Sequence, residues 1–79
     1  MIERKNTLPP RRFQLIRNED ISGVSGTGVV AFGVMFGDGT VALRWNSAAA
    51  STAVFASLSD LEAVHGHEGC TRVEWIDEE

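Results

Sequence analysis

The stretch GVVAFGVMFGDGTVALRWN, residues 28–46, decides the fold of this chain. Two segments rich in β-branched and aromatic residues, 28–36 and 40–46, flank the sequence Gly37-Asp38-Gly39. Asp-Gly is a preferred pair for a two-residue hairpin turn, because it tolerates the left-handed backbone that such a turn needs. The sequence therefore predicts two antiparallel strands joined at Asp38 and Gly39.

The predicted two-residue turn fixes the register of this hairpin. It brings together three apolar pairs: Phe36 with Val41, Val34 with Leu43, and Phe32 with Trp45. Side chains alternate between the faces of a strand, so these pairs share one face, which we expect to lie in the core. The opposite face presents Arg44 across from Gly33, with Met35 beside them. Gly33 in mid-strand predicts a bend or bulge that curls the sheet.

Arg44 is the candidate contact residue on that second face. A single cation among the small and apolar neighbours Gly33 and Met35 forms a shallow platform that fits a partner or a second copy of the chain. The alternative is an ordinary cross-strand ion pair between Arg44 and an acid such as Glu74.

Three further strands are predicted outside the hairpin. Alternating apolar and polar residues indicate strands at 12–17 and 71–76. Between them, the alanines of residues 46–57 favour helix, whereas the β-branched residues there favour strand. We assign a loop to 46–51 and a strand to 52–56.

One short helix is predicted at residues 57–66. Ser59 and Glu62 have the spacing of a capping box, and Gly66 suits the C-terminal cap. The apolar face of this helix consists of Leu58, Leu61 and Val64.

These elements predict a mainly β fold with one short α-helix. We expect a small curled antiparallel sheet or SH3-like barrel of four to five strands, with the helix before the last strand. Residues 12–76 then form a single domain, between an extended or disordered basic leader at 1–11 and an acidic tail at 77–79. A domain of 79 residues hides only about 60% of the surface of its unfolded chain, so self-association would add stability.

The composition indicates a reducing compartment and no contact with membranes. Cys70 is the only cysteine, so an internal disulfide is impossible. No secretory signal precedes the first apolar run. The longest such run, residues 29–36, is far shorter than the about 20 residues of a membrane-spanning helix. We therefore expect a cytoplasmic protein.

Two histidines, a glutamate and the lone cysteine lie close together in HGHEGC, residues 65–70. A zinc site needs about four ligands, and no second cluster in the sequence completes such a set. We predict a loop that ends the helix and leads into the last strand, with no metal ion. His65 and His67 stay candidates for contact with a ligand.

The glycine-rich stretch GVSGTG, residues 23–28, invites comparison with phosphate-binding loops. It lacks the lysine of a P-loop, and it opens a strand rather than a helix. Backbone amides around Gly26 and Gly28 can still capture an anion. The alternative is a tight loop that leads into the hairpin.

The charge of the chain is uneven along its length. Residues 1–17 carry a net charge of +4, from Glu3 and five basic side chains: Arg4, Lys5, Arg11, Arg12 and Arg17. The remaining residues carry a net charge of −8, which disfavours contact with nucleic acid backbones. The basic arm alone is a candidate for binding nucleic acid. The alternative is an arm that lies on the acidic surface of its own chain or of a neighbouring subunit.

The segments SGTG, DGT…LRW and HGH, within residues 12–76, resemble those of small proteins encoded by actinobacteria and their bacteriophages. That group has no established activity. The resemblance therefore implies origin, as a phage or prophage accessory protein that acts by binding in the host cytoplasm, and it assigns no functional residue.

We expect a non-enzymatic binding module that engages a host or phage protein and self-associates. No catalytic set, metal or cofactor is predicted, because no nucleophile elbow or triad signature occurs. One alternative is a protein that sequesters nucleotides, and another is nucleic-acid binding through the basic arm. The candidate residues for a ligand or partner are Arg44, Met35, Gly33, His65, His67, Gly26 and Gly28.

Overall fold

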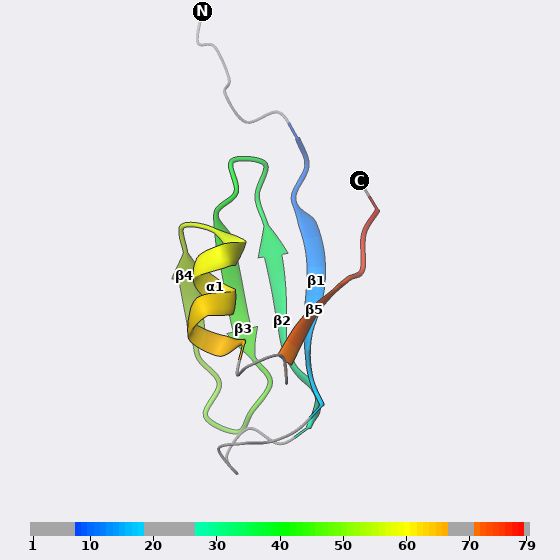
Figure 1. Ribbon diagram of the computed structural model, residues 1–79, viewed down its shortest axis with the longest axis vertical. Coiled ribbons are helices and arrows are strands. Elements are labelled where there is room, and N and C mark those ends of the chain that lie inside the picture. The colour runs from blue at the N-terminus through cyan, green and yellow to red at the C-terminus, as the bar shows by residue number, and fades with distance from the viewer. Residues whose placement is uncertain (1–7, 19–26, 67–70, 79) are drawn as a thin grey trace, which may run out of the picture.

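The computed structural model describes residues 8–18, 27–66 and 71–78. Their elements are five strands and one helix: β1 (Arg11–Arg17), β2 (Gly28–Met35), β3 (Val41–Trp45), β4 (Thr52–Phe55), α1 (Leu58–His65) and β5 (Thr71–Trp75). The strands form one antiparallel sheet in the order β4-β3-β2-β1-β5, so the last strand returns to pair with the first (Figure 1).

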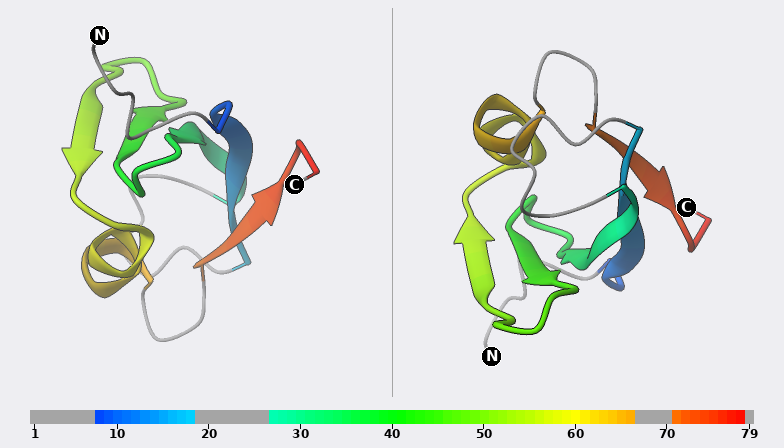
Figure 2. Two further views of the ribbon diagram at one scale, coloured as in Figure 1. Left: turned by 90° about the horizontal axis from the view of Figure 1, so that it is seen from above. Right: turned by 90° about the horizontal axis from the view of Figure 1, so that it is seen from below.

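The sheet is curled but not closed. Its two edge strands, β4 and β5, do not pair with each other, and α1 lies on the side toward which the sheet curves (Figure 2). The predicted class, mainly β with a short helix before the last strand, is confirmed. The SH3-like closed barrel is not what this sheet forms.

The β2–β3 hairpin turns through three residues, not two. Phe36 donates its N–H to the carbonyl of Thr40 at 2.8 Å, and Gly39 donates to the carbonyl of Phe36 at 2.9 Å. Gly39 has a φ of 94°, the left-handed conformation that completes a type I turn in a three-residue hairpin loop. The side chain of Asp38 also accepts from the N–H of Thr40 at 2.9 Å. The predicted two-residue turn is therefore wrong.

The longer loop shifts the register by one residue and exchanges the faces of β2. The pairs are Met35 with Val41, Val34 with Ala42, Gly33 with Leu43, Phe32 with Arg44, and Ala31 with Trp45. Because side chains alternate along a strand, one residue of slip moves Phe32 and Val34 from the predicted core face to the outer face. Phe32 is 48% exposed, whereas Leu43 of β3 is buried as predicted.

Gly33 faces the core, where the ring of Phe13 covers it. A Cβ atom at this position would overlap the end of that ring. Gly33 is therefore needed for close packing, and the predicted bulge at this position is wrong, because the pairing with both neighbouring strands continues through it. The bulge lies earlier in β2, because Leu15 pairs with Ala31 but Ile16 pairs with Val29.

The core lies on the inner face of the sheet and against α1. Its fully or nearly buried members are Phe13, Leu15, Val30, Ala31, Val41, Leu43 and Leu61. Trp75 of β5 packs edge-on against Phe13, with ring centroids 5.5 Å apart. The bulge explains why the consecutive residues Val30 and Ala31 are both buried.

The N-terminal cap of α1 is Ser57, not the predicted Ser59. The side chain of Ser57 accepts the capping hydrogen bond from the N–H of Asp60 at 3.1 Å. Gly66 is the C-terminal cap, as expected. Val64 is 60% exposed, and the half-buried His65 faces inward in its place, against Trp45 and Phe55.

Asp77 is bound to β1, so the predicted acidic tail at 77–79 begins with an anchored residue. Its carboxylate accepts from Nε and Nη2 of Arg12 at 2.9 and 2.8 Å, and from the Arg12 N–H at 2.9 Å. These hydrogen bonds lower the pKa of Asp77 to about 2. The contact extends the pairing of β5 with β1 beyond Trp75.

Replacement of Gly33 by alanine is expected to destabilise the protein by about 1–3 kcal/mol, because the methyl group has to displace the buried Phe13 ring. Urea unfolding of the Gly33→Ala variant measures this. The matched control is Gly33→Ala in a Phe13→Leu background, where the smaller side chain leaves room and the added cost should shrink. An unchanged cost in that background would contradict the packing explanation.

Asp77→Asn is expected to lower the melting temperature at neutral pH and to have no effect near pH 2. The folded-state pKa of Asp77 is depressed from 3.8 to about 2, so its contribution to stability is complete above 3.8 and is lost as the pH falls toward 2. Thermal unfolding of both proteins across this range is the measurement. Glu78→Gln, which removes the neighbouring carboxylate, is the control. Parallel pH profiles for wild type and Asp77→Asn would contradict the assignment.

Candidate functional site

The sheet has two surfaces that differ in shape and in chemistry. The outer face is broad and shallow. The inner face, together with α1, encloses a cavity. Some of the predicted site residues lie at these two surfaces, and the others do not.

The outer face carries a continuous apolar area, which we call the outer patch: Phe32, Val34, Ala42 and Val54. Val34, Ala42 and Val54 follow one another across three paired strands. Val54, on the edge strand β4, is 70% exposed. A shallow hollow of about 200 Å³ runs over the patch from Phe32 to Thr52. An outward-facing strand surface is normally polar, so this area is unusual for a face in contact with water.

Arg44 stands at the border of the outer patch, opposite Phe32 rather than Gly33. Its Nη1 donates to the hydroxyl of Thr52 at 3.0 Å. The alternative of an Arg44–Glu74 ion pair is wrong, because β2 and β1 separate β3 from β5, and Glu74 on β5 accepts from Gln14 Nε2 at 2.8 Å. Within residues 8–18, 27–66 and 71–78, Arg44 has no ion pair.

The inner cavity lies between α1 and β5 and has a volume of about 610 Å³. This size lies within the range of about 300–1,000 Å³ that is usual for small-molecule sites. Its apolar wall is formed by Leu15, Leu58, Leu61, Val73 and Trp75.

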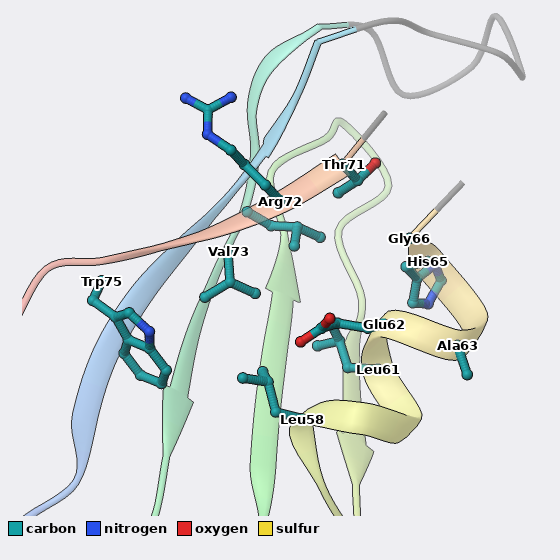
Figure 3. Close-up of a pocket in the computed structure, with 11 residues that line it drawn as sticks. Leu58, Leu61, Glu62, Ala63, His65, Gly66, Thr71, Arg72, Val73 and Trp75 are labelled. Atoms are coloured by element: carbon teal, nitrogen blue, oxygen red, sulfur yellow. The ribbon is translucent and has the colours of Figure 1, made fainter. Parts of the chain in front are cut away.

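Four polar side chains also line the cavity: Glu62, His65, Thr71 and Arg72. Figure 3 shows the Glu62 carboxylate reaching from α1 toward β5, whereas the Arg72 side chain extends away from the helix. Arg72 donates to Asn18 Oδ1 at 2.8 Å and lies 3.6 Å from a Glu74 oxygen. Glu62 is therefore directed inward, and Arg72 is held at the rim.

Arg17 is buried behind Thr71, with 3% of its surface exposed, and it does not itself line the cavity. Its Nε donates to the hydroxyl of Thr71 at 3.1 Å. The guanidinium carbon lies 5.9 Å from the ring centroid of Trp45. The sequence analysis grouped Arg17 with the basic arm because of its charge. The alternation of Phe13, Leu15 and Arg17 indicated that this side chain faces inward.

His65 and Gly28 lie near Arg17. His65 packs edge-on against Trp45 with ring centroids 4.8 Å apart, and it lines the cavity. Gly28 is paired with Arg17 across the sheet and has a φ of 83°. The structure thus brings two of the predicted ligand residues toward Arg17, at the end where β1 finishes and β2 begins.

The other predicted site residues lie elsewhere. Gly33 and Met35 are on the inner side of β2, and Met35 lines a separate hollow by the hairpin loop. Gly26, His67, Arg4 and Lys5 lie outside the described residues. In the part of the chain that is described, no three His, Cys, Asp or Glu side chains are placed to hold a metal ion.

Three side chains of the basic arm make contacts within the protein. The Arg11 guanidinium lies 3.9 Å from the ring centroid of Trp75. Arg12 is bound to Asp77, and Arg17 is buried. These contacts reduce the number of cations that the arm can offer to a nucleic acid, so the geometry supports that alternative least.

The family model described as Acb5 phage protein matches residues 10–77. It bears out the phage origin that the sequence resemblance implied. No curated protein and no solved structure matches the chain. Among the residues with described structure, no helix is long and apolar enough to cross a membrane.

Proposed function

This chain belongs to the Acb5 phage protein family, and we propose that it is an accessory binding protein of a phage that docks a protein partner on the outer face of its sheet. The docking surface is the outer patch, with Arg44 at its border. We propose binding rather than catalysis because the sequence has no nucleophile elbow or triad signature.

The observation that carries this proposal is the exposure of apolar side chains across neighbouring strands. Phe32 and Val54 are among the large hydrophobic residues most open to solvent, and Val34 and Ala42 join them into one area. Burial of apolar surface contributes about 25 cal/mol per Å². A partner that covers the whole patch therefore gains more binding free energy than a partner that contacts scattered residues.

Arg44 defines the chemistry of that partner. It has a hydroxyl partner but no carboxylate partner within residues 8–18, 27–66 and 71–78. A surface that matches this face therefore presents apolar groups together with a carboxylate, which forms strong charge-assisted hydrogen bonds with a guanidinium. Both a host protein and a phage protein can meet this requirement.

A second copy of the chain also meets it. Arg44, Phe32, Gln14 and Glu74 follow one another in a single row across β3, β2, β1 and β5. The outer faces of two copies can lie against each other across a twofold axis that runs along the strands, between β1 and β2. In this arrangement β3 of one copy lies opposite β5 of the other. Arg44 then faces the partner's Glu74. We therefore propose self-association through the outer face.

Phe32→Asp is expected to raise the dissociation constant of the self-associated form about tenfold or more, because Phe32 lies beside the proposed axis and the change places a charge where an aromatic ring is buried. Light scattering over a range of concentrations measures the molecular mass. The control is Val64→Asp, which introduces the same charge at an exposed apolar residue of α1, outside the outer patch. A strictly monomeric wild type, or equal effects of the two variants, would count against self-association through this face.

Charge reversal tests the orientation of the two copies. Arg44→Glu is expected to weaken self-association by a few-fold to about tenfold, because the introduced carboxylate of one copy repels the partner's Glu74. The double variant Arg44→Glu/Glu74→Arg restores the opposite charges and should recover most of the loss. Failure of the double variant to recover affinity would rule out this twofold arrangement while leaving the outer patch as a docking face.

A further inference from the structure

We propose that the inner cavity binds a small organic cation, an amine with an apolar body, whose ammonium group pairs with the Glu62 carboxylate. This site is distinct from the docking face of the proposed function, because the cavity lies between α1 and β5 and the outer patch lies on the opposite face of the sheet. Three features support it: the direction of the Glu62 side chain, the charges around that side chain, and the apolar wall of the cavity.

Glu62 supplies the negative charge of the cavity. Its side chain lines the space and reaches from α1 toward β5 (Figure 3). In the part of the chain that the structure describes, no hydrogen bond or ion pair involves this carboxylate. An ionised carboxylate only accepts hydrogen bonds, and a cationic donor makes the strongest of them. The chemical group that complements Glu62 is therefore a cation with N–H donors.

The C-terminal end of α1 adds partial negative charge at the same cavity. His65 and Gly66, where the helix ends, line the space together with Glu62. The C-terminus of a helix is the negative end of its dipole, because the last carbonyl groups have no partner within the helix. The His65 ring itself packs edge-on against Trp45 and Phe55. The field of the helix therefore favours a cation in this space and disfavours an anion.

The arginines nearest to the cavity do not neutralise Glu62. Arg72 extends away from α1 (Figure 3), donates to Asn18 Oδ1 at 2.8 Å and lies 3.6 Å from a Glu74 oxygen. Arg17 lies behind Thr71 and outside the lining of the cavity. Neither guanidinium forms an ion pair with Glu62. The charge of this carboxylate is therefore left for a ligand to compensate.

The remainder of the cavity fits an apolar body. Leu58, Val73 and Trp75 pack against the core but are only partly buried, and all three line the cavity. The buried side chains of Leu15 and Leu61 also line it. A hydrocarbon or aromatic group gains binding free energy when it covers this apolar surface. The volume of about 610 Å³ accommodates a small molecule that has such a group and an amine.

Titrations of the full chain, followed by the NMR shifts of its backbone amides, test this site with three probes of similar shape. They are 2-phenylethylamine, the neutral 2-phenylethanol and the anionic phenylacetate, at about pH 8, where a primary amine is protonated and an ordinary imidazole is neutral. We expect the shifts to lie on α1 and β5. The amine should bind about twofold to fivefold more tightly than the alcohol, as expected for an ion pair that water can reach. Phenylacetate should bind more weakly than the alcohol, and ethylamine, which lacks the ring, more weakly than 2-phenylethylamine.

Glu62→Gln should make the amine and the alcohol bind equally, because it removes the charge and keeps the shape of the side chain. The matched control is Asp60→Asn, which makes the same change of charge in the first turn of α1, at a residue that does not line the cavity. It should keep the preference for the amine. Phe32→Asp should leave this binding unchanged, which separates the cavity from the docking face. The proposal is overturned if the amine binds no more tightly than the alcohol, if Glu62→Gln keeps the preference, if Asp60→Asn removes it equally, or if the shifts lie away from α1 and β5.

Discussion

The contact between the ring of Phe13 and the backbone of Gly33 is the constraint on which the rest of this structure depends. It requires Gly33 to face the core, because any side chain there would overlap the ring. Since side chains alternate along β2, Ala31 and Met35 then face inward, and Phe32 and Val34 face outward. The packing of one aromatic ring against one glycine therefore decides which apolar residues are left on the outer face.

This constraint also explains the limit of the sequence-based prediction. The strands, the helix before the last strand and the general class follow from alternation and capping signals, and the structure confirms them. The predicted register of the hairpin differs from the observed one by one residue, because Gly37-Asp38-Gly39 suits both a two-residue turn and a three-residue loop. Only the long-range contact of Gly33 with Phe13, twenty residues earlier in the chain, distinguishes the two.

The candidate sites were predicted less completely than the fold. Arg44 was placed on the outer face, as the structure has it, but over Gly33 instead of Phe32. Arg17 was grouped with the basic arm by its position in the chain, although its parity with Phe13 and Leu15 indicated the inner face. A net charge counted along a segment does not say which cations are buried. That information lies in the alternation of side chains and in contacts with Thr71 and Trp45.

Because the sheet is not closed, its edge strands affect how the protein associates at high concentration. Among the described strands, β4 and β5 each pair with one neighbour, so each offers backbone donors and acceptors to a foreign strand. These edges are four and five residues long, and short edges give an incoming strand few hydrogen bonds to make. The short edge strands therefore oppose uncontrolled strand-to-strand polymerisation, although the apolar outer patch is open to a partner.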